Sequence, residues 1–293
     1  MNRNKSMSER IGMVIVYSIL ILFCSSIILA FMNVIAISLS GKTSVMRGEV
    51  TFIPKNVNFE AYKVIIQKDS VWSAYANTLF IIIAGTPLQI MLTCFAAFPL
   101  SRTDLVGKKF ITLMLVFTMW FSAGMIPMFL LVRTLKLYNT LWALIVPGLI
   151  SAYNVMIIRN FFQEIPSSLE ESARIDGCND ARVLFQIFIP LSKPVLATVS
   201  LWVIVGYWNN YMSALIYIRN PKLYTLQVVL RNIVLTGSDI SGEVLSAQEN
   251  DEELLSDCIK YAAIIVTTIP IMCVYPFLQK YFVKGVIVGA VKG

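Results

Sequence analysis

Long apolar runs alternate with short polar segments along most of the chain. Six of these runs contain no Asp, Glu, Lys or Arg and reach the length of about 20 residues that a helix needs to cross a bilayer. The runs are Ile11–Gly41, Ser70–Ser101, Phe110–Val132, Leu137–Ile158, Pro194–Ile218 and Tyr261–Gln279. We therefore predict an all-α, polytopic membrane protein with six transmembrane helices.

The composition supports a membrane protein and argues against several other classes. Hydrophobic residues make up 57% of the chain and charged residues 14%, whereas a soluble domain carries roughly a quarter charged residues. The formal net charge is +7, but the basic residues are spread singly between apolar runs, unlike the basic patch of a nucleic-acid binder. Nucleic acid is therefore not an expected partner.

The residues that usually carry metal or acid–base chemistry are scarce. The sequence has no His, which removes the commonest metal ligand and the usual proton shuttle near neutral pH. No two of the five cysteines have the spacing of a zinc site. We predict no catalytic residue, no metal and no cofactor, and thus a protein that is not itself an enzyme.

Six spans place both termini on the same side of the membrane. If that side is the cytoplasm, its segments hold slightly more than half of the Lys and Arg residues, as the positive-inside rule favours. The first apolar run extends from Ile11 to Leu39, beyond the roughly 7–15 apolar residues of a signal peptide. We therefore predict a retained first helix and two cytoplasmic termini.

The segment between the fourth and fifth spans, residues 159–193, has clear helix signals. Ser167 with Glu170 three residues later is typical of a capping box at a helix start, and Gly177 suits a left-handed helix end. Asp180 is placed to cap a second helix over Ala181–Ile189. A short helix of this kind could dock into a partner's cleft or merely turn the chain, and the residues alone leave both open.

The spacing in this segment resembles the EAA loop of ABC importer permeases, whose pattern is E-A-A-x3-G-x9-I-x-L-P. Here the residues are Glu171-Ser172-Ala173, then Gly177, then Ile187-Phe188-Ile189-Pro190. Ser stands where the pattern has Ala and Ile where it has Leu, and both replacements keep size and character. Further segments extend the resemblance to permeases of carbohydrate importers of the maltose-transporter type: Asn77–Leu79, Ser101–Arg102, Arg159–Phe162, Leu191–Pro194, Trp208–Asn209 and Tyr281–Gly293. Within that family the chain looks most like the branch associated with oligosaccharides from complex polysaccharides.

The resemblance implies a type I ABC importer permease fold with three parts. Residues 1–69 would hold the cytoplasmic N-terminus, the first transmembrane helix and the first outer loop. Residues 70–282 would form the permease core, with five transmembrane helices and the cytoplasmic coupling loop 159–193, and residues 283–293 a cytoplasmic tail. The implied location is the bacterial cell membrane.

The resemblance also implies a function, partners and contact residues. The implied function is that of a permease subunit in an ATP-driven carbohydrate importer. The expected carbohydrate is an oligosaccharide. The partners are a second homologous permease, a cytoplasmic ABC ATPase dimer, an extracytoplasmic substrate-binding protein, the carbohydrate and membrane lipid. The residues expected to contact the ATPase are Glu170, Glu171, Ser172, Ala173, Asp176 and Gly177.

The source of energy follows from a missing motif. The chain has no G-x-x-x-x-G-K-[ST] segment to hold nucleotide phosphates, so ATP hydrolysis is assigned to a partner. An ion-coupled secondary transporter is the main alternative, but such proteins usually carry ionisable residues within the membrane, and the six runs have none. A membrane scaffold subunit also remains open.

One span carries residues that suit a sugar. Trp208 and Tyr211 are three residues apart and share a helix face, with Asn209 beside them. Aromatic faces and amides bind sugars, so we predict these three residues as substrate contacts. Polar and aromatic side chains also pack against one another between membrane helices, and this alternative stays open.

Overall fold

The computed structural model describes residues 7–236 and 257–273, and every regular element in those two ranges is a helix. Contacts divide the chain into two units. The first is Met1–Asp69 with Asn232–Thr268, and the second is Ser70–Arg231 with Ile269–Gly293. The expected tail, residues 283–293, lies outside the described residues.

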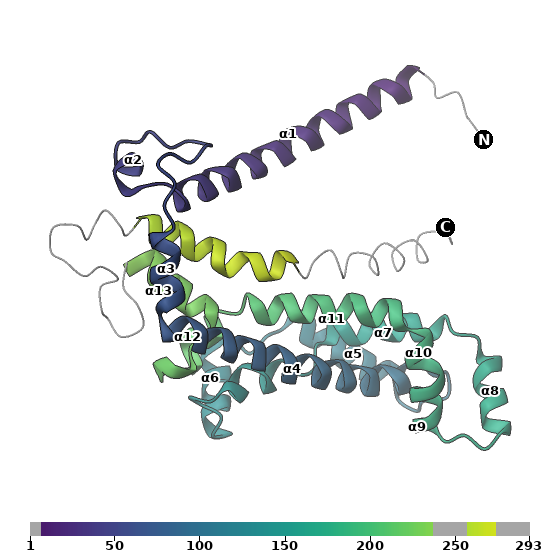
Figure 1. Cartoon of the computed structure of the whole chain (residues 1–293). Helices are drawn as coiled ribbons and strands as arrows, with labels where there is room; N and C mark the ends of the chain where they lie inside the picture. The colour runs from purple at the N-terminus through teal and green to yellow at the C-terminus, as the bar shows by residue number, and fades with distance from the viewer. Residues whose placement is uncertain (1–6, 237–256, 274–293) are drawn as a thin grey trace. The chain divides into compact units, whose positions relative to one another are not determined.

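The first unit is built on one long apolar helix, α1 (Met7–Ser38) (Figure 1). Its stretch Ile11–Ser38 is long and apolar enough to cross a membrane and is apolar on all sides, as expected for a helix that faces lipid. Short helices follow: α2 (Lys42–Met46), α3 (Glu60–Gln67) and the larger part, up to Thr268, of a helix over residues 257–273. The hydroxyls of Ser38 and Tyr62 share a 2.7 Å hydrogen bond that ties the end of α1 to α3.

The second unit contains the other continuous helix of membrane-crossing length, α4 (Asp69–Ser101). The helices that follow it before the charged loop are α5 (Lys108–Trp120), α6 (Met125–Thr134), η1 (Leu141–Leu144), η2 (Val146–Gly148) and α7 (Ala152–Gln163). After that loop come α11 (Lys193–Trp208), α12 (Met212–Tyr217), η4 (Pro221–Leu223) and α13 (Leu226–Thr236), which belongs to this unit up to Arg231.

Most of the remaining apolar runs are divided into two shorter helical segments by a bend or a break. Here the structure differs from the prediction of one transmembrane helix per apolar run. The expected third span consists of α5 and α6, which meet at 113°. The break ends at Gly124, whose φ of 84° and ψ of 175° are a glycine conformation. The expected fourth span is also bent, by 49° between the η1–η2 turns and α7. The expected fifth span is interrupted after α11, whose C-cap is Asn209.

Two continuous helices of sufficient length, or five spans when each bent pair counts as one, are found in the described part of the chain. The expected sixth span, Tyr261–Gln279, begins within the helix over residues 257–273 and continues beyond the described residues. The number of six spans therefore stays a prediction.

The core of the second unit lies between α4, α7 and α11. The buried residues of α7, namely Val155, Ile158 and Phe162, follow one another at helical spacing. Gly85 of α4 lies so close to α11 that a Cβ atom there would be 2.9 Å from the ring of Tyr207. Between membrane helices such close approach stabilises through packing contacts, because lipid is as apolar as the side chains.

Candidate functional site

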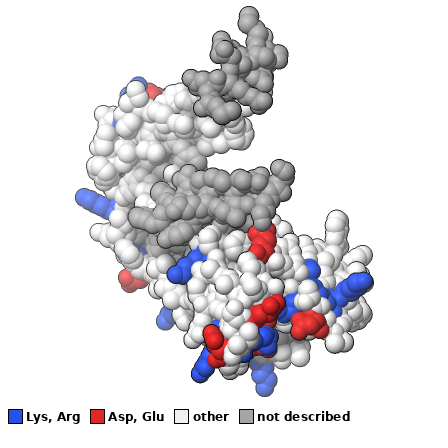
Figure 2. Space-filling view, turned by 90° about the vertical axis from the view of Figure 1, so that its right-hand side faces the viewer, with Lys and Arg blue, Asp and Glu red and all other residues white. Residues whose placement is uncertain are grey.

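The charged loop between α7 and α11 folds into a short helix, α8 (Ser167–Ile175), and a second bent segment. That segment consists of α9 (Asp180–Val183), a π-helical turn (Leu184–Phe188) and α10 (Ile189–Leu191). It meets α11 at 83°. Figure 1 shows α8 at one end of the second unit, beyond the ends of α4 and α11, and in Figure 2 side chains of both charge signs gather at this end.

The first turn of α8 differs from the predicted capping box. Pro166 is the N-cap residue, and its side chain makes no capping hydrogen bond. The carboxylate of Glu170 instead contacts the guanidinium groups of Arg102 and Arg174. Two charge-assisted contacts outweigh one backbone N–H, which explains why the capping-box prediction was wrong.

The other end of α8 agrees with the sequence. Gly177 has a φ of +80°, and two backbone bonds close the helix. The N–H of Gly177 donates to Arg174 O at 3.0 Å and that of Cys178 to Ala173 O at 2.9 Å, which is a Schellman ending. The predicted helix stop at Gly177 is confirmed.

The second helix begins one residue earlier than predicted and has a different cap. The Asn179 side chain, not that of Asp180, accepts the capping hydrogen bond, from the N–H of Arg182 at 2.9 Å. The Asp180 carboxylate forms an ion pair with Arg174 instead, with Oδ1 2.6 Å from Arg174 Nη2. The predicted uninterrupted helix also contains a π-helical turn.

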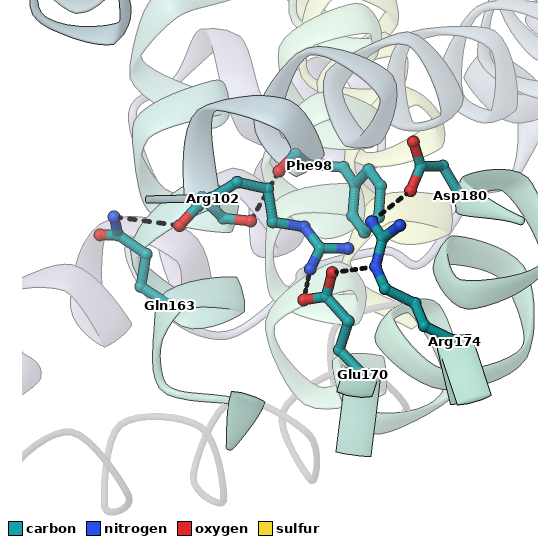
Figure 3. A network of polar contacts seen from close by, with 7 residues as sticks. Phe98, Arg102, Gln163, Glu170, Arg174 and Asp180 are labelled. Atoms are coloured by element: carbon teal, nitrogen blue, oxygen red, sulfur yellow. Dashed lines mark hydrogen bonds and ion pairs between the residues drawn. The ribbon is translucent and has the colours of Figure 1, made fainter. Parts of the chain in front are cut away.

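Four residues of alternating charge connect three parts of the second unit (Figure 3). Arg102, directly after α4, contacts Glu170 of α8. Glu170 Oε1 lies 2.9 Å from Arg174 Nε, and Arg174 contacts Asp180 of α9. The network thus joins the end of α4 to both helices of the loop.

Arg102 is held in place by aromatic rings as well as by charge. Its guanidinium carbon lies 4.3 Å from the ring centroid of Phe98 and 5.0 Å from that of Phe188. The Phe188 ring also packs edge-on against Phe98 and Phe162, with centroids 5.1 and 5.3 Å apart. Arg102 and Glu170 are only 13% and 17% exposed, so each would be a poorly solvated charge without the other.

The surroundings of Arg102 act on its pKa in both directions. Burial, followed by the neighbouring Arg174 cation, lowers the pKa of Arg102, while Asp180 and Asp104 raise it. A guanidinium starts from such a high pKa that it stays charged. The Arg102 side of the ion pair therefore remains a cation.

The carbonyls that end α4 are also capped by side chains from neighbouring helices. Arg159 Nε donates to Leu100 O at 3.1 Å and Gln163 Nε2 to Ser101 O at 3.5 Å. The Lys108 ammonium contacts the carbonyl of Arg102. Cationic donors suit the negative end of a helix dipole, so this end of α4 is a fixed anchor for the loop.

The predicted contact residues divide between two faces of α8. Ala173 is buried and Glu170 half-buried against the bundle. The other four, Glu171, Ser172, Asp176 and Gly177, are exposed. Ile175 shares the outer face with Glu171 at helical spacing, and the residue is 87% exposed. This outer face offers a carboxylate and an apolar side chain to a partner.

The predicted sugar contacts lie around the end of α11 in different environments. Trp208 is buried, with its ring centroid 6.4 Å from that of Tyr75. Asn209 and Tyr211 are exposed. A cavity of about 590 Å³ in the second unit is lined instead by their neighbours Tyr207 and Asn210. Substrate contact by Trp208, Asn209 and Tyr211 stays a prediction.

Sequence analysis missed two features of this region. Arg102 was noted only for its place in the family resemblance, although a lone cation directly after an apolar span, opposite an acidic helix, is a usable signal for an ion pair. The polar residues that line the cavity come from separate helices, and only the fold brings them together.

Comparison with known proteins gives independent evidence for the family of this chain. Residues 67–288 match the family described as "Binding-protein-dependent transport system inner membrane component". The polygalacturonan/rhamnogalacturonan transport system permease protein YtcP of Bacillus subtilis is 42% identical, over 98% of this chain and 100% of that protein. The arabinooligosaccharides transport system permease protein AraQ of Halalkalibacterium halodurans is 28% identical, over 89% and 90% of the two chains.

A solved structure matches over nearly the whole chain. It is a chain of a bacterial ABC transporter involved in the import of the acidic polysaccharide alginate, and it superposes with a TM-score of 0.87. The two sequences are 31% identical, and the match covers 96% of this chain and 100% of the other. The all-helical architecture described above is therefore that of an ABC importer permease. The chain belongs to the family of binding-protein-dependent transport system inner membrane components, the permease subunits of ABC importers.

Proposed function

We propose that this chain is the membrane-spanning permease subunit of an ATP-driven importer of an oligosaccharide, in a bacterial cell membrane. A second homologous permease completes the pathway, and a cytoplasmic ABC ATPase dimer supplies the energy. A substrate-binding protein outside the membrane delivers the sugar. The chain crosses the membrane six times with both termini in the cytoplasm. Residues 1–69 carry the first span, residues 70–282 the permease core and residues 283–293 the tail.

The single observation that carries this proposal is the build of α8. It is a short helix with an acidic and apolar outer face, and its inner face is fixed to α4 through Glu170 and Arg102. A partner that moves the outer face therefore moves the end of α4 as well. Reversing a conformational equilibrium from 1:99 to 99:1 needs about 5.5 kcal/mol, which a nucleotide-driven partner can supply.

On this proposal, Glu171, Ser172, Asp176 and Gly177 meet the ATPase directly, while Glu170 and Ala173 hold α8 against the bundle. The sugar as substrate is supported by the relatives, whose names specify polygalacturonan, rhamnogalacturonan and arabinooligosaccharides, and by the alginate importer. Trp208, Asn209 and Tyr211 near the end of α11 are proposed to contact the sugar as it passes.

A charge reversal on the outer face of α8 tests this function. We expect Glu171→Lys to lower both co-purification of the ATPase and oligosaccharide uptake by about tenfold, because an exposed acceptor is replaced by a cation. Glu164→Lys is the matched control, since Glu164 is an exposed carboxylate at the end of α7, outside α8.

The readouts are ATPase recovered with the tagged chain from native membranes, and uptake of a labelled oligosaccharide mixture in whole cells. Normal recovery and uptake with Glu171→Lys would contradict the proposed docking face. Absence of any ATPase from the purified wild-type complex would contradict the proposed function as a whole.

A further inference from the structure

A hollow of about 470 Å³ lies between α5 and α7 in the second unit, and half of its lining is cationic. The lining consists of three cations and three neutral residues: Lys108, Lys109, Arg159, Thr112, Leu113 and Val116. Along α5, Lys109, Leu113 and Val116 follow one another at helical spacing, so the hollow runs along one face of that helix. We call this feature the basic hollow.

The positive charge of the basic hollow is not compensated within the part of the chain that the structure describes. There, no carboxylate forms an ion pair with Lys108, Lys109 or Arg159, and none of the six lining residues is acidic. Like charges repel more strongly beside an apolar medium than in bulk water. An anion that enters the hollow therefore relieves a repulsion as well as making new contacts.

Two of the three cations are held in place by the end of α4. Arg159 Nε donates to Leu100 O at 3.1 Å, and the Lys108 ammonium contacts the Arg102 carbonyl. A guanidinium has five N–H donors. In the described residues Arg159 uses Nε and a weak Nη1 contact with Met156 Sδ, at 3.8 Å. Its other donors are available in the fork geometry that suits paired phosphate oxygens.

The fixed cations argue against a simpler explanation of this cluster. Lysines at the ends of membrane helices often only extend their ammonium groups into water. Lys109 is exposed and fits that explanation, but Lys108 and Arg159 are half-buried and tied to backbone carbonyls. Their charges therefore stay beside the hollow whether or not an anion is bound.

The basic hollow lies where the charged and apolar parts of the chain meet. Residues 102–109 separate two apolar runs, and α5 enters the second run directly after Lys109. From Lys108 the lining continues to Val116, about 12 Å along the helix axis at 1.5 Å per residue. Within the described chain α5 has no buried residue, and Phe110, Leu113 and Phe117 are exposed. Cations at one end of an apolar helix face match the headgroup and the acyl chain of a phospholipid.

We propose that the basic hollow binds an anionic phospholipid of the leaflet on the α8 side of the membrane. The phosphodiester lies among the three cations, and an acyl chain lies along Leu113 and Val116. Free phosphate offers the same oxygens but nothing for the apolar face, so the occupant is assigned as a lipid. The inference goes beyond the proposed function, because it requires a membrane but neither a sugar nor an ATPase.

The test uses the complete transporter, purified with its partner subunits and reconstituted in phosphatidylcholine nanodiscs. The probe is phosphatidylglycerol with a photoreactive group in one acyl chain, and mass spectrometry of the digested chain locates the attachment. We expect attachment to α5 within residues 110–117. An excess of unlabelled phosphatidylglycerol should displace the probe, whereas the same amount of phosphatidylethanolamine, which has no net charge, should not.

Single variants of the cations show whether the headgroup is held as proposed. Lys109→Gln should weaken probe affinity about fivefold, the effect of one cation near an anionic lipid, and Lys109→Arg should keep the wild-type affinity. Arg159→Gln should weaken it at least as much, with partner co-purification as the check on folding. Lys193→Gln is the matched control, because Lys193 is an exposed lysine at the first position of α11 and outside the hollow.

Several results would overturn the inference. Equal displacement by both unlabelled lipids would indicate an unselective boundary lipid, and displacement by inorganic phosphate at constant ionic strength would indicate a free-phosphate site. Attachment outside α5, or none because the second permease covers the hollow, would also contradict it. So would unchanged affinity in Lys109→Gln and Arg159→Gln. These failures are distinct from a failure of the proposed function, because the assay contains neither sugar nor nucleotide.

Discussion

At the scale of single residues, Arg102 matters most for the candidate coupling site. It is one half of a poorly solvated ion pair, and it also lies over two aromatic rings, so its charge and its planar shape both contribute to its position. Its partner Glu170 contacts a second arginine as well. Losing Arg102 therefore removes the ion pair that connects α8 to the end of α4.

We expect Arg102→Gln to lower stability by about 1.5–3 kcal/mol, the range for a hydrogen bond to a charged group. We also expect it to reduce the amount of sugar taken up per ATP hydrolysed. Thermal unfolding of the purified complex and paired transport and hydrolysis assays measure the two effects. Arg182→Gln on α9 is the matched control, because Arg182 is an exposed arginine of the same loop.

A double-mutant cycle with Glu170→Gln shows whether the effect belongs to the pair. If the ion pair is responsible, the double variant should be no less stable than the worse single variant, since the second change removes a charge already without its partner. Fully additive losses of stability would contradict the pairing as the cause.

Gly177 is the second residue with a defined structural role. Its φ of +80° is a left-handed conformation that costs most residues roughly 1–2 kcal/mol. We expect Gly177→Ala to loosen the end of α8, seen as faster hydrogen exchange of the Cys178 amide, and to reduce coupled uptake. Gly177→Asn should fall between wild type and Ala, because Asn tolerates this conformation better. Equal exchange rates in all three proteins would show that the left-handed turn is not what holds the helix end.

At the scale of elements, sequence reasoning succeeded where one local signal decides the structure. Gly177 fixes the end of α8 by itself, and the uniformly apolar stretch of α1 needs no partner to be recognised as a span. Reasoning failed where a tertiary contact competes with a local one. Glu170 pairs with Arg102 instead of capping α8. Because Arg102 lies far away in the sequence, no local pattern predicts this ion pair.

The bends in the expected spans were missed for a related reason. Hydropathy over a window measures how well a segment tolerates lipid, not whether its helix is continuous. The 113° bend between α5 and α6 depends on backbone angles at Gly124 that only glycine adopts without strain. The cavity was missed because its lining comes from several of these broken elements.

The α5–α6 bend leads to a prediction at this scale. We expect Gly124→Ala to destabilise the chain by about 1–3 kcal/mol, because the backbone at residue 124 is strained for any other residue. Gly12→Ala in α1 is the matched control, since a Cβ there meets nothing within 4 Å and alanine favours a helix. Thermal unfolding in detergent and accumulation in the membrane compare the two. Equal stability of both variants would mean that the backbone at residue 124 relaxes without cost.

At the scale of the whole molecule, the proposed mechanism depends on which side of the membrane each loop occupies. The charge distribution favours the proposed orientation only slightly, since both sides carry similar numbers of Lys and Arg. Two exposed residues mark opposite sides under the proposal: Ile175 on the outer face of α8, 87% exposed, and Ile53 in the loop after α1, 75% exposed. With a cytoplasmic N-terminus, the single crossing by α1 places Ile53 outside the cell. Four crossings in total precede α8, so Ile175 lies on the cytoplasmic side.

Single-cysteine variants made in a background free of the five native cysteines test this arrangement directly. A membrane-impermeant maleimide added to intact, cell-wall-stripped cells should label Ile53→Cys and not Ile175→Cys, and inside-out vesicles should give the reverse. Labelling of Ile175→Cys in those vesicles should slow severalfold while the ATPase is bound and recover once it is stripped from the membrane, because docking covers the outer face of α8. Labelling of Ile175→Cys from outside the cell would reject the coupling role of α8. Correct sidedness without protection by the ATPase would leave the orientation intact and place the contact with the ATPase on another surface of the chain.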